Sequence, residues 1–398
     1  MPRSTSDTAQ LPAPAPDALA HSARLHAVVA NEIAQAGGCI PFRRFMELAL
    51  YAPGLGYYSA GAHKFGGAGD FVTAPELGSL FARCLARQCQ QVMAQAGANI
   101  LECGAGTGAL AAELLREWAR LDCLPERYAI LEVSADLRAR QEQTLRERVP
   151  DLLARVAWLN ELPAHGFCGV ILGNELLDAM PVDIFVRRDG MTYERMVADD
   201  GGQLVYRDEP LTSEPLLQRV TELQRDLGAS IFGDHYFSEV NFAAEGWLTS
   251  AARGLERGAI VLADYGFPAR EYYHPDRSGG TLMCHYRHRA HPDPLRLLGL
   301  QDITAHVDFT AMAQAAHDAG CDVLGYTNQA QFLLNCGLLD MVAAADATDA
   351  RAYLALTSEV KRLTLPSEMG ELFKVLVVGK GIDDALLGFV SGDRRHRL

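Results

Sequence analysis

Long hydrophobic runs are missing from this sequence: none can span a bilayer, and the N-terminus lacks the apolar core of a secretory signal. Only two arginines precede Leu25, and Asp7 and Asp17 are acidic there, so a mitochondrial transit peptide is poorly supported. Basic residues are outnumbered: the sequence has 36 Lys and Arg and 50 Asp and Glu, which gives a formal net charge of -14. A nucleic-acid-binding protein must neutralise phosphates with a basic face. We therefore expect a cytoplasmic protein, or a mitochondrial matrix protein if its source is eukaryotic, without membrane insertion or a nucleic-acid partner.

Several chemical signatures are absent as well. The nine cysteines include no C-x-x-C pair, which indicates free thiols in a reducing compartment. Cys284, His285, His288 and His291 are metal-binding residue types, but their spacing fits no standard zinc arrangement, so we expect no metal. No phosphate-binding loop and no Ser-His-Asp signature appears. The informative features are therefore the order of strands and helices and the residues that follow each strand.

Apolar strands and amphipathic helices alternate along most of the 398 residues. This pattern predicts an α/β protein with a parallel sheet. We divide the chain into a disordered tail (1–17), a helical and loop-rich extension (18–98) and a core (99–398). Insertions into the core are expected at about 182–250 and 265–310, where the alternation is interrupted.

The expected elements follow from the periodicity of the apolar residues. Strands are predicted at 99–101, 128–133, 155–159, 168–172, 259–264 and 373–378. Helices are predicted at 18–36, 136–148, 211–227, 309–319, 329–345 and 349–361, with others opening at about residues 41, 75 and 109. Within the insertions we expect a β-hairpin over 182–206 and a long irregular loop over 274–294.

Residues 99–119 (NILECGAGTGALAAELLREWA) combine a buried strand, a glycine loop and the start of a helix. In α/β proteins this arrangement brings a ligand against the backbone, and Gly104, Gly106 and Gly108 permit a turn that a Cβ would obstruct. A dinucleotide fingerprint reads G-x-G-x-x-G, whereas this loop reads G-x-G-x-G and follows the carboxylate of Glu102. That anion opposes a pyrophosphate but suits a cationic ligand such as S-adenosylmethionine. A tight turn without a ligand is the alternative.

Further candidate residues follow the next two strands. Glu132 ends the strand after the glycine loop, where an acid can accept both hydroxyls of a ribose, in NAD or in S-adenosylmethionine. The third strand ends in Trp158, Leu159 and Asn160, and in this topology it borders an adenine. These three residues are candidates for packing on the base and bonding its edge. A helix-start carboxylate and a core tryptophan are the alternatives.

The stretch GNELLDAMP (173–181) follows the fourth strand, at the edge where open α/β sheets bind ligands. If it makes one helical turn, Glu175 and Asp178 share a face. Two carboxylates can hold a guanidinium by charge-assisted hydrogen bonds and localise its electrons on one nitrogen. The alternative is that Asn174 caps a helix whose first turn contains these acids.

The segment 51–76 is glycine-rich and aromatic. Its candidate lid or substrate-contacting residues are Tyr57, Tyr58, Asp70, Thr73 and Glu76. Long loops of this kind are usually lids or recognition surfaces, although Thr73 and Glu76 also fit plain helix capping. We expect this segment and the 265–310 insertion to close over the cofactor and to form a groove for an extended polypeptide.

Eight motifs between about residues 25 and 380 resemble those of a known family. They are LYAPGLGYY, GDFVTAPELGSLF, LECGAGTGAL, GNELLDAMPV, LADYGF, GGTLMCHYRH, DITAHVDF and MGELFKVL. The family is that of the MidA-type class I S-adenosylmethionine-dependent methyltransferases. It includes mitochondrial complex I assembly factors that methylate an arginine of a complex I subunit, and bacterial relatives.

The resemblance implies a Rossmann-like fold with a seven-stranded, mostly parallel sheet, and with the N-terminal extension and inserted segments over the active site. By the family pattern, Glu102, the three glycines and Glu132 bind the cofactor. Asn174, Glu175 and Asp178 face the substrate, with Asn174 next to the cofactor as well. Cys103 is a departure within the glycine motif, and we do not expect it to prevent binding.

We therefore expect an S-adenosylmethionine-dependent methyltransferase that acts on an arginine of a protein, with a respiratory complex I subunit as the implied partner. An NAD-dependent oxidoreductase is disfavoured by Glu102 and by the glycine spacing. A small-molecule methyltransferase and a non-catalytic assembly factor that retains the fold are the remaining alternatives. The sequence determines neither the target protein nor the oligomeric state.

Overall fold

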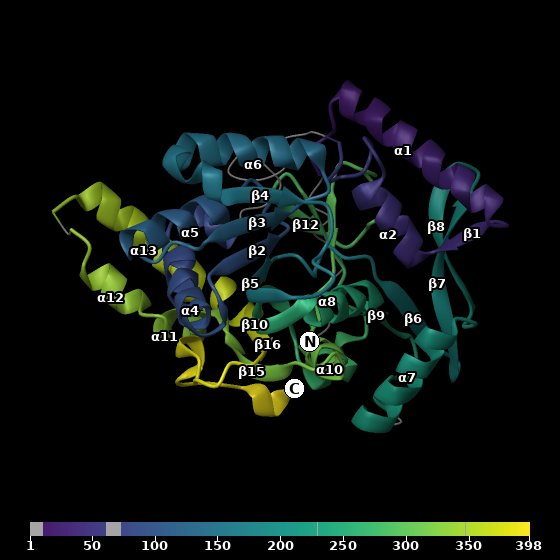
Figure 1. Ribbon diagram of the computed structural model, residues 1–398. Coiled ribbons are helices and arrows are strands. Elements are labelled where there is room, and N and C mark those ends of the chain that lie inside the picture. The colour runs from purple at the N-terminus through teal and green to yellow at the C-terminus, as the bar shows by residue number, and fades with distance from the viewer. Residues whose placement is uncertain (1–10, 61–72, 229, 347) are drawn as a thin grey trace.

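A central sheet of eight strands organises the computed structural model, which describes residues 11–60, 73–228, 230–346 and 348–398 (Figure 1). Seven strands lie in the order β15-β16-β10-β5-β2-β3-β4, and the two-residue β14 pairs with β10. Their bounds are β2 (Asn99–Cys103), β3 (Arg127–Leu131), β4 (Val156–Leu159), β5 (Phe167–Asn174), β10 (Leu255–Phe267), β14 (Val307–Asp308), β15 (Asp322–Asn328) and β16 (Phe373–Lys380). β16 runs antiparallel to β10 and β15, and the pairs among β2, β3, β4, β5 and β10 are parallel. The predicted α/β class with a mostly parallel sheet is confirmed.

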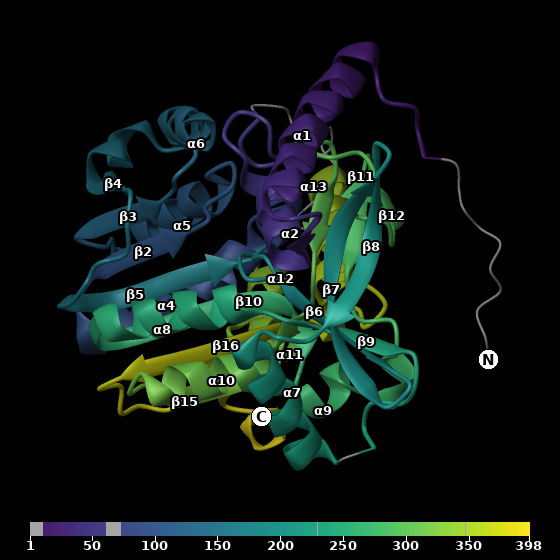
Figure 2. The ribbon, with the colours of Figure 1, turned by 90° about the vertical axis from the view of Figure 1, so that its right-hand side faces the viewer.

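Helices cover both faces of this sheet because successive strand residues point to opposite faces. Ile100 and Val170 belong to one hydrophobic cluster, and their neighbours Leu101 and Ile171 belong to another. The first cluster includes α4 (Leu80–Ala96), α5 (Ala109–Arg120), α6 (Ala135–Arg148), α11 (Gln329–Asn335), α12 (Leu338–Ala343) and α13 (Ala350–Thr364). The second includes α8 (Phe242–Gly254) and α10 (Phe309–Asp318), which cover the other face in Figure 2.

Two smaller antiparallel sheets lie beside the core. One contains β1 (Cys39–Pro41), β7 (Met191–Asp200), β6 (Asp183–Arg188), β9 (Tyr236–Val240) and β8 (Gln203–Pro210); the other contains β12 (Arg289–His291), β11 (Met283–Tyr286) and β13 (Asp302–Thr304). The N-terminal helices α1 (Pro16–Gln35) and α2 (Phe42–Tyr51) pack there. A single hydrophobic cluster joins Phe42 of the extension, Ile184 of the first insertion and Cys284 of the second. Three distant segments of the chain therefore share one accessory core.

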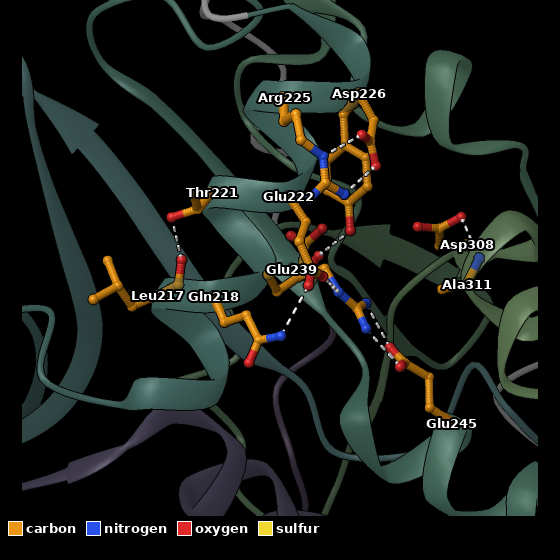
Figure 3. A network of polar contacts seen from close by, with 12 residues as sticks. Leu217, Gln218, Thr221, Glu222, Arg225, Asp226, Glu239, Glu245, Asp308 and Ala311 are labelled. Carbon is orange, nitrogen blue, oxygen red and sulfur yellow. Dashed lines mark hydrogen bonds and ion pairs between the residues drawn. The ribbon is translucent and has the colours of Figure 1, made fainter. Parts of the chain in front are cut away.

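The remaining elements are the helix α7 (Glu214–Leu227), the short helices α3 (Ala74–Leu77), α9 (Ala269–Tyr272) and α14 (Met369–Leu372), and the 3-10 turns Pro150–Arg155, Pro275–Arg277, Leu387–Phe389 and Arg395–Arg397. α7 is tied to the core because Arg219 donates to both carboxylate oxygens of Glu245 on α8, at 2.7 Å each, in the network of Figure 3. A bidentate pair of this kind fixes orientation as well as distance. Among the helices of the described residues, none combines the length and the apolar character that a bilayer span requires.

The expected hairpin over 182–206 is present as the antiparallel pair β6–β7, and it belongs to the five-stranded sheet. Other predicted elements were wrong in detail. The expected irregular loop over 274–294 contains β11 and β12. The expected helix over 329–345 is broken at Gly337, whose φ of 87° is left-handed and ends α11 before α12. The strands β9 and β15 and the helix α8 were not predicted. Apart from the local break at Gly337, these errors fall where an element is stabilised by distant partners.

Candidate active site

The carboxyl ends of the central strands open into a cavity of about 1050 Å³. Its walls include most of the sequence-predicted residues, namely Tyr58, Thr73, Glu76, Glu102, Gly104, Gly106, Glu132, Asn174, Glu175 and Asp178. Gly108, Tyr57, Trp158, Leu159 and Asn160 are described but do not line it. Asp70 lies outside the described residues. The fold thus brings residues of four predicted segments to one place: the segment 51–76, the glycine loop, the strand end at Glu132 and the stretch 173–181.

The glycine loop between β2 and α5 is left-handed at every glycine. Gly104, Gly106 and Gly108 have φ values of 71°, 52° and 81°, which side chains rarely adopt. A Cβ on Gly104 would lie 2.9 Å from a methyl of Leu176, and one on Gly108 would lie 3.0 Å from the Cα of Gln141. A Cβ on Gly106 would meet no atom within 4 Å. Two glycines therefore serve close packing, whereas the backbone of Gly106 faces open space in the cavity wall.

Glu102 is the penultimate residue of β2 and is almost entirely buried, at 3% exposure. Its Oε2 accepts a hydrogen bond from the hydroxyl of Tyr128 at 2.7 Å. Burial raises the pKa of Glu102 to about 7, and the hydrogen bond partly opposes this shift. Ionised Glu102 would be stabilised by a cationic ligand in the cavity.

Glu132 is held by α6. Its Oε1 accepts from the backbone N–H of Ser134 at 2.9 Å, and its Oε2 accepts from Gln141 Nε2 at 3.0 Å. The same Gln141 amide donates to the carbonyl of Gly106 at 3.1 Å, and its oxygen accepts from Trp158 Nε1 at 2.9 Å. Burial raises the pKa of Glu132, and the bonds from Ser134 and Gln141 oppose the shift. Gln141 therefore connects the glycine loop, Glu132 and Trp158 on β4.

The last two residues of the predicted adenine border have other contacts. Arg138 Nη2 donates to the carbonyl of Leu159 at 2.5 Å and to Oδ1 of Asn160 at 2.7 Å. The side of the cavity next to Glu132 is instead lined by residues 133–137. The structure places Trp158 behind Gln141, where it orients that side chain.

The loop 174–181 after β5 is fixed from several directions. The backbone N–H of Glu175 donates to Ala263, and its φ of 47° is left-handed, a strained conformation for a residue with a side chain. The carboxylate of Asp264 accepts from the backbone N–H groups of residues 176, 177 and 178 at 3.2, 2.9 and 3.3 Å. The amide of Asn241 donates to the carbonyls of residues 177 and 180 at 3.1 and 3.3 Å. Such a network holds the loop in one conformation despite the strain.

Asp178 and Glu175 form an acidic cluster with Asp264. Tyr265 donates its hydroxyl proton to Asp178 Oδ2 at 2.5 Å, and Asn174 Nδ2 donates to Glu175 Oε1 at 3.3 Å. Asp178 Oδ1 is buried without a hydrogen-bond partner. Burial raises the pKa of Asp178 to about 6, and burial with the charge of Asp178 raises that of Glu175 to about 8. Burial and both neighbours also raise the pKa of Asp264.

No Lys or Arg side chain forms an ion pair with this acidic cluster in the part of the chain that the structure describes. Seven Asp or Glu side chains and only one arginine, Arg362, line the cavity among the described residues. Uncompensated buried carboxylates are costly. The cavity is therefore built for a ligand that brings positive charge.

The predicted lids contribute to the walls. Tyr51 donates to the carbonyl of Ala179 at 2.9 Å, and Tyr58 donates to Oδ1 of Asp302 in the second insertion at 2.9 Å. Thr73 stands at the N-cap position of α3 without a side-chain capping bond. Glu76 on that helix accepts from the hydroxyl of Thr107 in the glycine loop at 3.3 Å. The N-terminal extension thus touches both the glycine loop and the loop 174–181.

Comparison with known proteins identifies the fold and its chemistry. A family model described as "Putative S-adenosyl-L-methionine-dependent methyltransferase" matches residues 81–327. The chain belongs to this family. A crystal structure from Burkholderia thailandensis, bound to S-adenosyl-homocysteine, is 49% identical, covers 98% of this chain and 100% of its own, and has a TM-score of 0.93. Proteins named "Protein arginine methyltransferase NDUFAF7, mitochondrial" from Danio rerio and Mus musculus are 27% and 28% identical, and the matches cover 86% and 84% of this chain and 84% and 80% of theirs.

The predicted family and the predicted cofactor, S-adenosylmethionine, are confirmed. The cavity of this methyltransferase fits that cofactor, because Gly106 leaves open space and the walls are rich in acids, as a sulfonium and an ammonium require. The substrate and the compartment of this chain stay predictions.

Sequence reasoning missed several residues of the methyltransferase site. The motif LADYGF contains Asp264 and Tyr265, and DITAHVDF contains His306, which also lines the cavity, but none of them received a role. Gln141 had a weak signal, since it is a polar residue between Leu137 and Leu145 on the buried stripe of α6. Asn241 had none, because α8 itself was not predicted.

Proposed function

We propose that this methyltransferase transfers a methyl group to an arginine side chain of a protein. The observation that carries the proposal is the acidic cluster on the loop 174–181, where Asp178 Oδ1 is buried without a partner. A guanidinium is planar, cationic and has five N–H donors, so it can satisfy two carboxylates at once. The relatives named as protein arginine methyltransferases support the same substrate class.

The cofactor would lie against the glycine loop. Glu132 would accept the ribose hydroxyls, the backbone at Gly106 would pass beside the ligand, and Glu102 would contribute negative charge to its cationic end. Asn174 lies between this side and the acidic cluster. Trp158, Leu159 and Asn160 would act from behind Gln141 and Arg138 rather than in contact with the base.

The chain's own residues would activate the guanidinium by polarisation. An arginine has a pKa above ~12 and cannot be deprotonated in bulk water before reaction. Asp178, fixed by Tyr265, would orient two N–H groups, and Glu175 would concentrate the lone pair on the remaining nitrogen. Bound S-adenosylmethionine supplies an electrophilic methyl group. Glu175, which would be ionised when it pairs with the guanidinium, would accept the proton that the methylated nitrogen releases.

The polypeptide would bind where the extension and the second insertion meet. Tyr51 and Tyr58 of the extension and Asp302 of the insertion line the cavity, and this combination suits a cationic side chain on an extended chain. A respiratory complex I subunit is the first candidate, as the family resemblance implies. We propose a cytoplasmic or, in a eukaryote, mitochondrial matrix location, which the nine free cysteines support.

Mass spectrometry after incubation with methyl-labelled cofactor tests the proposal. Purified chain is added to a cell lysate and, in parallel, to a complex I subunit preparation, and labelled methylarginine is sought in protein digests. Label in small molecules alone would favour a small-molecule methyltransferase. Cofactor binding without any label transfer would favour a non-catalytic assembly factor, and both results contradict the arginine assignment.

A further inference from the structure

A chain of contacts leads from β9, in the five-stranded antiparallel sheet, to Asp178. Glu239 on β9 is fully buried, and its two oxygens accept from the backbone N–H of Thr281 at 3.0 and 2.9 Å. The Thr281 hydroxyl donates to Glu239 Oε2 at 2.9 Å and accepts from the backbone N–H of His306 at 3.1 Å. The ring of His306 meets the ring of Tyr265 edge-on at 5.1 Å and 80°. Tyr265 in turn holds Asp178.

Glu239 anchors this chain firmly. It is labelled among the polar contacts of Figure 3, and the remaining partners of its carboxylate are the backbone N–H of Leu282 at 3.3 Å and the hydroxyl of Tyr272 at 3.4 Å. No cation pairs with it in the described ranges. Hydrogen bonds to a buried carboxylate are strong, and losing one leaves charge unsatisfied. Thr281 is therefore held tightly at the base of the second insertion.

His306 is packed as an uncharged ring. Its ring stacks nearly parallel on the ring of Phe267, with 5.3 Å between the ring centroids and an interplanar angle of 13°. Its contact with Tyr265, in contrast, is edge-on. Its Nδ1 is buried and makes no hydrogen bond within ordinary distance limits. Burial and the charges of Arg277 and Lys374 lower the pKa of His306 to about 4, against a weak opposing contribution from the Thr281 backbone. A neutral imidazole does not compete with a substrate cation for Asp178.

We propose that Thr281 and His306 are positioning residues through which Glu239 fixes the Tyr265 ring, so that its hydroxyl occupies Asp178 Oδ2 and leaves Oδ1 to the substrate. Residues of both insertions would thereby fix the orientation of the Asp178 carboxylate on the core. This inference rests on the proposed function only in that Asp178 contacts the substrate; the nature of that substrate does not enter.

Proton NMR of the full-length protein tests the contact directly. A tyrosine hydroxyl in a short bond to a carboxylate gives a far-downfield resonance, and its loss in Tyr265→Phe assigns it. Thr281→Val removes the hydroxyl at nearly constant shape, and Thr281→Ser is the matched control that keeps it. We expect the resonance to move or vanish in the valine variant and to persist in the serine variant, with S-adenosyl-homocysteine affinity within about twofold of the parent in both.

A second pair of variants covers the case in which Thr281→Val does not fold. His306→Phe keeps a flat ring and should keep the resonance, whereas His306→Ala should lose it. With a methyl-accepting protein, kcat should fall about tenfold or more in Thr281→Val and His306→Ala, as expected for a misplaced substrate-holding group.

Three results would overturn the inference: no such resonance in the parent, an unchanged one in Thr281→Val or His306→Ala, or equal loss in both members of a pair. If the resonance responds as expected but no arginine is methylated, the proposed function fails and the positioning role stands.

Discussion

The two ends of the cavity are built differently. The glycine-loop end, defined here by Glu102, Gly106 and Glu132, comes from one continuous stretch of chain between β2 and α6. The acidic-loop end, defined by Glu175 and Asp178, depends on the N-terminal extension, α8, the end of β10 and the second insertion. A site for a common cofactor can be encoded locally, whereas a site for a particular substrate is assembled from distant segments.

The two ends also differ in how their acids are satisfied. Glu102 and Glu132 have hydrogen-bond donors within the protein, from Tyr128 and Gln141 among others. Asp178 keeps a buried oxygen without a partner. The acids of the glycine-loop end thus have hydrogen-bond partners within the protein, whereas a charged ligand would complete the acidic-loop end.

The largest expected effect is at the glycine-loop end. Gly106→Val places a branched side chain in open cavity space at a φ of 52°, so S-adenosyl-homocysteine affinity should fall by about a hundredfold or more. Gly201→Val is the matched control, because Gly201 is also left-handed, at 63°, with open space around its Cβ, but lies in the β7–β8 turn. Calorimetry with the parent should show affinity for this ligand and none for NAD. Equal binding by the two variants would mean that the loop does not contact the cofactor.

The next effect separates turnover from cofactor binding. Glu175→Gln and Asp178→Asn should each lower the methylation rate about a hundredfold, or ~3 kcal/mol, because a buried guanidinium is left half paired. Affinity for S-adenosyl-homocysteine should stay within about twofold, since both residues belong to the acidic-loop end. Rates are measured with the acceptor protein found by mass spectrometry. If both variants methylate at the parental rate, these acids have only a structural role.

Raised carboxyl pKa values occur at both ends of the cavity in the ligand-free protein, and substitution of Glu175 isolates the share of the acidic-loop end. The pKa of Glu175 is raised to about 8 and that of Asp178 to about 6, against values near 4 in an unfolded chain. A raised carboxyl pKa favours the folded state below the unfolded pKa, and this contribution is lost as pH rises through the folded pKa. Thermal unfolding should therefore occur at lower temperature as pH rises from 5 to 8. Glu175→Gln should flatten this dependence, and substitution of an exposed acid, Glu256→Gln, should not.

The smallest effects should come from behind the glycine-loop end. Gln141→Leu removes the donor to Glu132 and to the Gly106 carbonyl, and should weaken S-adenosyl-homocysteine binding about tenfold, or ~1.5 kcal/mol. Trp158→Phe removes only the donor that orients Gln141, and should weaken S-adenosyl-homocysteine binding by about two- to threefold. Calorimetry on both variants measures the ranking. A larger loss of affinity with Trp158→Phe than with Gln141→Leu would indicate that Trp158 contacts the adenine directly.

Some features of the chain were accessible from the sequence. The α/β class, the mostly parallel sheet and the cofactor follow from strand-helix alternation and from the motif around Gly106, which are patterns within about twenty residues. Glu102, Glu132, Glu175 and Asp178 were placed at strand ends for the same reason, and the structure brings all four to the cavity. Local periodicity is sufficient because parallel strands end at one common edge.

Other features were decided only by the tertiary structure. β9, β11 and α8 lie in segments whose local patterns are weak, and they form because distant strands and a shared hydrophobic cluster stabilise them. Asp264 and Asn241 reach the loop 174–181 from segments about 60 to 90 residues away, so no spacing rule could pair them with it. The sequence alone determined the sheet, the cofactor loop and the acids at its edge. The conformation of the acidic loop depends on long-range hydrogen bonds and packing, which exist only once the chain has folded.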